Sequence, residues 1–194
     1  MKKYLALALL ASAPFAAANA AELHYSFVEV GYSKTELTDS GFSAKPDGYA
    51  IKAQGGFGDA FYGAIAMHKD SLHGEDIAPW ELTGGYHHGL AEGTDLLAEI
   101  SYIGMNTRLS GTDYHNDGYR AAVGVRSALG EHVELGAKVT WTGVENSDKV
   151  VGLNVNGLVK FNDTWGVYGQ YHFKEYNFIG ADADNWQVGV RDSF

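Results

Sequence analysis

The chain has 194 residues, with 25 glycines, three prolines, no cysteine, 13 % aromatic residues and a formal net charge of −10. The lack of cysteine excludes disulfides and thiolate metal sites, and the acidic balance argues against a nucleic-acid partner, because phosphate binding needs clustered Lys and Arg. The length suits one domain. Glycine costs about 1 kcal/mol in a helix interior, so its abundance favours β-structure.

The first twenty residues have the features of a secretory signal peptide. Lys2 and Lys3 form a basic start, residues 4–11 are apolar, and Ala18 and Ala20 supply small residues at the −3 and −1 positions of a cleavage site. The apolar run is too short for a membrane span. We therefore expect residues 1–20 to be removed during export.

Alternation of apolar and polar residues with a period of two recurs ten times in the rest of the chain. Alternation of this kind predicts strands and does not fit helical spacing. In the first segment Phe27 shares a face with Glu29, which predicts a bulge or mixed burial. If residues 60–69 and 165–173 are loops, the strand count falls to eight. The ten expected strands are residues 24–34, 48–57, 60–69, 80–88, 95–105, 119–126, 133–141, 151–161, 165–173 and 185–194.

The connections between these segments alternate in length. Short turns are expected at residues 58–59, 89–94, 127–132 and 162–164, and mostly longer, acidic loops at 35–47, 70–79, 106–117, 143–149 and 174–184. Short turns at one end and longer loops at the other are typical of an up-and-down barrel in an outer membrane. The turns and both termini would then be periplasmic and the loops extracellular.

Aromatic residues lie at both ends of the apolar faces, and smaller residues such as Ala53, Val123 and Val155 lie between them. Aromatic rings prefer the headgroup level of a bilayer, whereas a soluble barrel, with its apolar face inward, gives no reason to sort aromatics to both rims. We therefore predict a closed antiparallel transmembrane β-barrel over residues 21–194. The predicted membrane-interface aromatics are Tyr32, Tyr49, Phe57, Phe61, Trp80, Tyr102, Tyr119, Trp141, Phe161, Trp165, Phe173, Trp186 and Phe194.

With these features the chain resembles the small bacterial outer-membrane β-barrels of the OmpA/OmpX superfamily. The resemblance rests on the signal peptide, the alternating strands and the closing segment 186–194, which ends in Phe194 and looks like the signal read by barrel-assembly machinery. Residues 22–34 are also similar to the opening strand of a family of small vesicle-associated barrels from xanthomonads. The resemblance implies an outer-membrane location, with lipid and lipopolysaccharide as neighbours.

The polar face of the barrel would line its lumen. Buried charges must be paired, so a ladder of ion pairs in a plugged barrel is one interpretation. The other is a narrow hydrated pore for ions or small solutes, because ten strands lie between filled eight-stranded barrels and open porins. The predicted lumen-lining residues are Glu29, Lys52, Glu81, Glu99, Arg120, Arg126, Glu134, Lys138, Lys160, His172 and Arg191.

Catalysis and metal binding have weak support in the sequence. His87 and His88 are adjacent and would point to opposite faces of a strand. The His24-Tyr25-Ser26 motif has no obvious acid and lies at the wrong end for a lipid-modifying enzyme, which is the least favoured alternative. No catalytic residue, metal site or cofactor is predicted. The favoured role for this barrel, a monomer, is structural or interactive: envelope integrity, vesicle surface or adhesion through acidic outer loops.

Overall fold

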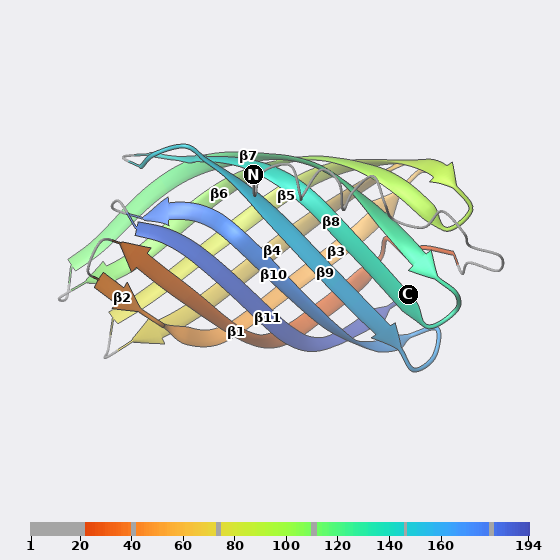
Figure 1. The fold of residues 1–194 in the computed structure, drawn as a ribbon, viewed down its shortest axis with the longest axis horizontal. Coiled ribbons are helices and arrows are strands. Elements are labelled where there is room, and N and C mark those ends of the chain that lie inside the picture. Colours follow the sequence, from red (N-terminus) through yellow and green to blue (C-terminus); the bar gives the residue numbers. More distant parts are fainter. Residues whose placement is uncertain (1–21, 40–41, 73–74, 110–111, 146, 179–180) are drawn as a thin grey trace.

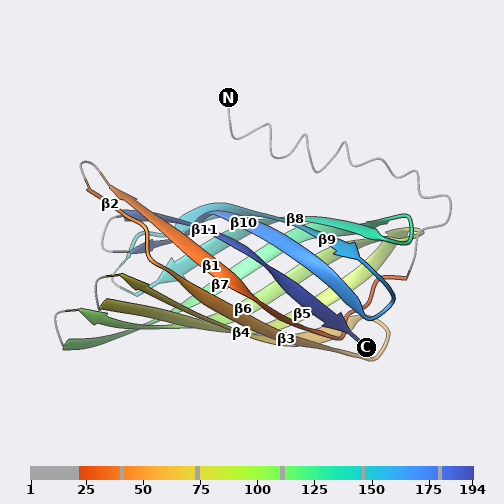
Figure 2. The same ribbon diagram turned by 90° about the horizontal axis from the view of Figure 1, so that it is seen from below.

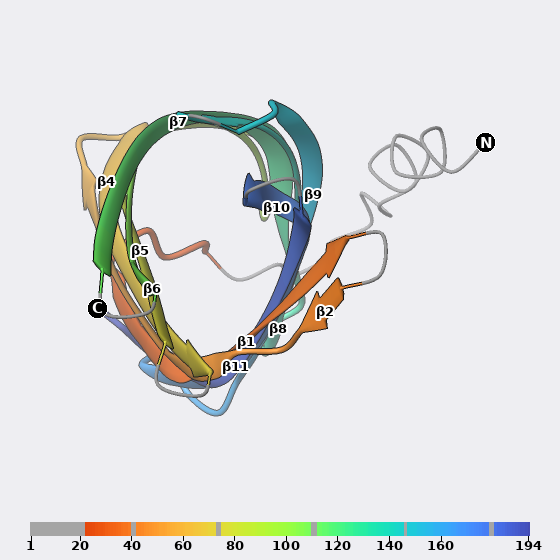
Figure 3. The same ribbon diagram turned by 90° about the vertical axis from the view of Figure 1, so that its left-hand side faces the viewer.

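A closed barrel of ten antiparallel strands makes up most of the chain. The computed structural model describes residues 22–39, 42–72, 75–109, 112–145, 147–178 and 181–194. Each barrel strand pairs with its sequence neighbours, and β1 pairs with β11 to close the ring (Figures 1 and 3). The strands are β1 Phe27–Asp39, β2 Phe42–Ala44, β3 Asp47–Phe57, β4 Phe61–Leu72, β5 Glu75–Ala91, β6 Thr94–Leu109, β7 Thr112–Leu129, β8 Val133–Val144, β9 Val150–Lys160, β10 Trp165–Phe178 and β11 Ala181–Ser193.

All ten predicted segments are strands, so the count of ten is confirmed and the alternative of eight is wrong. The eleventh strand, β2, has three residues and pairs with the end of β1 through Leu37 and Ala44. Thr35 N–H then donates to the Pro46 carbonyl at 2.9 Å, and β3 continues along the same edge of β1. Among the described residues no helix is long and apolar enough to cross a membrane.

One end of the barrel, here called the turn end, carries the short connections. Gly58, Gly93 and Gly130 have positive φ angles of 62°, 65° and 74° in three of these turns. Glycine adopts this left-handed conformation without the steric cost that a Cβ would bring. Figure 2 shows this end at the right, with the strands inclined to the long axis of the barrel.

The opposite end, here called the hairpin end, differs from expectation. Most of the acidic segments predicted as loops continue the strands: β6 and β7 stay paired as far as Leu109 and Thr112, and β10 and β11 pair as far as Phe178 and Ala181. The backbone ladder continues because side chains such as Met105 face a shared interior there. Residues 147–149 are irregular, as predicted.

Side chains alternate between interior and exterior along the strands. Pairing of β1 with β11 is continuous from Phe27 to Thr38, so β1 has no bulge, and the mixed burial arises because Phe27 and Glu29 both face inward. The register shift lies instead in β10, between His172 and Tyr176, where Lys174 has a φ of 51°.

Candidate functional site in the barrel interior

The barrel interior holds the eleven side chains that the alternation assigned to the lumen. Glu29, Arg120, Arg126, Glu134, Lys160 and Arg191 are buried, each with 8 % or less of its surface exposed. Lys52, Glu81, Glu99, Lys138 and His172 are partly buried and line an internal cavity. The inward direction follows from strand pairing, because a period of two places these residues on the concave face of the closed sheet.

The ion pairs nearest the turn end centre on Glu134, which is 2 % exposed. Its carboxylate accepts from Arg126 Nη2 at 2.5 Å and Nε at 3.0 Å, and lies 3.1 Å from Lys160 Nζ. Arg191 Nη1 lies 3.6 Å from the same carboxylate, while Arg191 Nη2 donates to Glu29 at 2.6 Å. Strands β1, β7, β8, β9 and β11 are therefore joined by one network.

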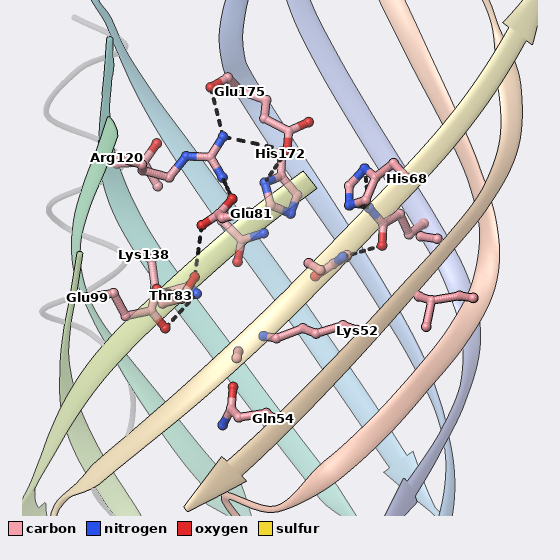
Figure 4. Close-up of a pocket in the computed structure, with 18 of the residues that line it drawn as sticks. Lys52, Gln54, His68, Glu81, Thr83, Glu99, Arg120, Lys138, His172 and Glu175 are labelled. Carbon is pink, nitrogen blue, oxygen red and sulfur yellow. Dashed lines mark hydrogen bonds and ion pairs between the residues drawn. The ribbon is translucent and has the colours of Figure 1, made fainter. Parts of the chain in front are cut away.

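A second group of ion pairs lies further along the barrel and centres on Arg120 (Figure 4). Arg120 Nη1 donates to Glu81 at 2.6 Å, Nε donates to Thr142 Oγ1 at 3.0 Å, and Nη2 lies 3.7 Å from Glu175. These contacts connect β5, β7, β8 and β10 across the lumen.

Glu99 forms the third ion pair, with Lys138 at 2.8 Å. The Tyr62 hydroxyl also donates to Glu99 at 2.7 Å. The Phe27 ring makes cation–π contacts with two side chains. Arg191 Cζ lies 4.1 Å and Lys52 Nζ 5.3 Å from the ring centroid. Aromatic rings thus supply part of the stabilisation of charges taken out of water.

The N-terminal segment, residues 22–26, crosses the interior at the turn end (Figure 3). The Tyr25 ring stacks on His87, with centroids 3.8 Å apart, and its hydroxyl donates to Asp95 at 2.6 Å. Arg126 donates to a backbone carbonyl of the segment at 2.8 Å. The segment is thus held against β5, β6 and β7, on the far side of the ring from β1.

The hairpin end is closed by inward-facing apolar residues from several strand extensions. Beneath them Asn185 donates to Ser33 and Thr35 at 3.0 Å, and Thr35 donates to Asp70 at 2.5 Å. The hairpin end therefore contains a small apolar core, which lies between the ion pairs and that end of the barrel. This hairpin-end cluster consists of Leu37, Ala44, Ile77, Met105, Val144, Tyr176 and Ala183.

Between these two closures the described interior contains small cavities, among them two of about 70 and 60 Å³. Both are lined by Lys52, Gln54, Glu99, Lys138 and Asn154, so one layer of side chains separates them. Each is larger than the roughly 10–15 Å³ that a single water molecule requires, so each can hold water. Within the described residues no group of three or more His, Asp or Glu side chains is arranged to hold a metal ion.

The exterior is apolar, and the thirteen predicted interface aromatics all lie on it, exposed or half-exposed. Tyr102 contacts both Trp80 and Tyr119, with ring centroids 5.5 and 5.4 Å apart. At the turn end, Phe57 stacks on Phe61 at 6.1 Å. Exposed aliphatic residues lie between the two aromatic belts: Val30, Ile51, Ile65, Leu82, Ile100, Val123 and Val188.

The sequence reasoning missed several interior residues. Asp70 and Glu175 were assigned to acidic loops, but they are 3 % and 7 % exposed. Extending the alternation of β4 by one step would have placed Asp70 inside. Glu175 could not be placed in this way, because the irregularity at Lys174 changes which residues face inward. Tyr25 lies in a segment without regular structure, where alternation carries no information.

Comparison with solved structures shows the fold of bacterial outer-membrane barrels. The β domain of the Bordetella autotransporter BrkA is 13 % identical with a TM-score of 0.53, and the match covers 88 % of this chain and all of that one. Ail, the attachment invasion locus protein of Yersinia pestis, is 13 % identical with a TM-score of 0.48, covering 89 % and 100 %. Neisserial surface protein A is 16 % identical with a TM-score of 0.42, covering 87 % and 96 %.

No family model and no curated protein matches the sequence. At these identities the structural likeness concerns the fold alone. The similarity of the opening strand to the xanthomonad vesicle-associated family therefore stays a prediction.

Proposed function

We propose that this chain is an outer-membrane barrel with a closed lumen and a structural, surface-interaction role carried by its hairpin end. The observation that carries the proposal is closure at both ends: the N-terminal segment at the turn end and the hairpin-end cluster at the other. Between them five of the six interior Lys and Arg side chains, all but Lys52, lie in ion pairs with interior carboxylates. An interior filled in this way stabilises a barrel and gives no continuous path for solutes.

The membrane location is supported by the exterior. Val123 and Ile100 are 46 % and 67 % exposed although they lie in the middle of the barrel wall, and aromatic belts flank this aliphatic band. Such a surface is unfavourable in water and suits a bilayer. The proposed orientation places the turn end in the periplasm and the hairpin end outside the cell, with lipopolysaccharide around it.

The surface role is supported by the continuous strand pairing at the hairpin end. Seven residues of β6 extend beyond Tyr102 to Leu109, paired throughout with β7, which is about 23 Å along the strand at about 3.3 Å per residue. The hairpin-end cluster supports such extensions from inside. They would present a fixed outer surface for adhesion or for packing in the envelope.

We also propose that the barrel has no catalytic activity. In the His24-Tyr25-Ser26 motif the Ser26 Oγ accepts the Gly56 N–H at 3.1 Å, and among the described residues no hydrogen bond joins the His24 ring to Ser26. His87 and Asp95 form a pair at 3.0 Å, but they hold Tyr25 and no serine or cysteine. The proposal also includes removal of residues 1–20 and membrane assembly through the C-terminal segment 186–194, which comprises the end of β11 and Phe194.

The first test is planar-bilayer conductance of the folded protein, which distinguishes the closed barrel from the alternative of a small passive pore. We expect no steady openings. Openings whose ion preference changes in Lys52→Gln or Glu99→Gln would overturn the closed lumen in favour of the pore.

A second test addresses the surface role. Met105 and Asn116 are cross-strand partners, so residues 106–115 can be replaced by Asn-Gly, which favours a two-residue hairpin turn. Cells expressing this folded variant are expected to adhere less to a surface than cells expressing the full chain, or to lose resistance to detergent. Unchanged behaviour in both assays would refute a role for this hairpin.

A further inference from the structure

Lys52 stands apart from the other interior cations. Arg120, Arg126, Lys138, Lys160 and Arg191 each lie within 4 Å of a carboxylate. Among the described residues Lys52 has no such ion pair, and its contact is the Phe27 ring at 5.3 Å. Its side chain extends into the cavity of about 70 Å³ (Figure 4). A charge removed from water without a partner is costly.

Two further polar groups without partners line the same cavity. Asn154 is 3 % exposed, and its Nδ2 donor is buried without a hydrogen bond. His172 is its cross-strand neighbour, and the Nε2 atom of His172 is likewise buried without a partner. A buried polar group without a hydrogen bond is destabilising, so two of them beside an ammonium without an ion pair point to a binding site.

The carboxylates that line this cavity are already engaged. Glu81 and Glu175 lie within 4 Å of Arg120, and Glu99 is bound by Lys138 and Tyr62. The groups left unsatisfied are thus an ammonium, an amide N–H₂ and an imidazole nitrogen. Ammonium and amide N–H groups are donors, and an imidazole nitrogen is a donor in one of its tautomers, so the chemistry favours an acceptor that carries negative charge.

We propose that the barrel interior binds one small inorganic anion of the halide class between Lys52, Asn154 and His172. The anion would neutralise Lys52 and accept from the two other side chains. A cavity of about 70 Å³ has room for one such ion with a water molecule, and it is far smaller than the roughly 300 Å³ of a pocket for organic ligands. The site does not depend on the surface role proposed above.

Bromide is the probe for this site, because its anomalous X-ray scattering identifies it. The full chain is refolded from urea into detergent micelles in sodium bromide, so that the ion is present when the barrel closes, and is then crystallised. We expect one anomalous peak beside Lys52 Nζ, and its loss in Lys52→Met. Refolding of Lys34→Met, which removes an outward-facing lysine, should leave the peak unchanged. The absence of a peak in the wild-type crystal would overturn the proposal.

A solution measurement covers the case in which a variant does not crystallise. At constant ionic strength, exchanging gluconate for bromide should raise the urea midpoint of unfolding, because an ion that binds the folded state alone stabilises it. The Asn154→Asp variant supplies a carboxylate between His172 and Lys138, its partners on the neighbouring strands. We expect it to fold without bromide and to lose the bromide response. A bromide response equal to that of the wild type in both Asn154→Asp and Lys52→Met would refute the site.

Discussion

Glu29 and Arg191 face each other across the line where the first and last barrel strands meet. They are register partners in the β1–β11 pair, and Arg191 donates to Glu29 Oε1 through Nη2 at 2.6 Å and Nε at 2.9 Å. Both side chains are more than nine-tenths buried, and the guanidinium lies over the Phe27 ring. A deeply buried ion pair therefore joins the two strands that close the barrel.

Removing Arg191 should be strongly destabilising. Arg191→Met leaves Glu29 buried without its partner, and breaking a buried pair from one side costs about 3–5 kcal/mol. The measurement is urea unfolding of the protein in detergent micelles. The double variant Glu29→Gln/Arg191→Met should cost less than the two single variants added together. If the costs are simply additive, the two side chains are not coupled.

A charge on the outer surface should also be costly. Val123 lies outward on β7 at 46 % exposure, and an arginine at the bilayer midplane of a barrel costs about 2–4 kcal/mol. We expect Val123→Arg to lower the free energy of unfolding in lipid vesicles by this amount, with Val123→Met as the size-matched control. A cost near zero for Val123→Arg would show that this face is not in lipid.

The hairpin-end cluster predicts a contrast between two methionines. Met105 is 1 % exposed inside the cluster, whereas Met67 is 56 % exposed on the exterior. Truncation of a buried methionine to alanine costs about 2–5 kcal/mol, because it leaves a cavity. Met105→Ala should therefore lower the unfolding free energy well below that of Met67→Ala in the same micelles. Equal losses would mean that the cluster is not a packed core.

The N-terminal segment predicts controlled access to the lumen. The chain has no cysteine, so a single Gln54→Cys is its sole thiol, placed beside the segment because Gln54 donates to the Tyr25 carbonyl at 3.3 Å. Tyr25→Ala, which removes the contacts to His87 and Asp95, should make this thiol react several-fold faster with a small water-soluble reagent. Tyr49→Ala on the exterior is the control. An unchanged rate in Tyr25→Ala would show that the segment does not close the turn end.

Much of this architecture is encoded in local alternation. A period of two, as in residues 133–141, is enough to predict a strand and to say which side chains share a face. This is why the charged residues and the aromatic residues fall on opposite faces of the strands. Alternation carries no information on partners across the barrel. The pairing of Arg120 with Glu81, two strands away, depends on barrel curvature and side-chain reach.

The hairpin end was harder to predict for a physical reason. Acidic residues such as Asp182 and Asp184 have loop-like composition, but on β11 they face outward while Ala183 and Asn185 fill the interior. Polar residues on one face of a strand and small residues on the other look like a loop in the sequence. Only the closed ring shows that the inner face is buried.

The contact between Glu29 and Arg191 joins residues 162 positions apart in the chain. Loop-closure entropy must be overcome before such a contact forms, and domains dominated by distant contacts fold slowly. Neither side chain can be satisfied until the last strand is in place, so every earlier intermediate carries an open sheet with two unpaired edges. Unpaired strand edges favour pairing between different chains. Because the ring closes only when the last strand pairs with the first, the unfolded chain needs protection from aggregation until that step.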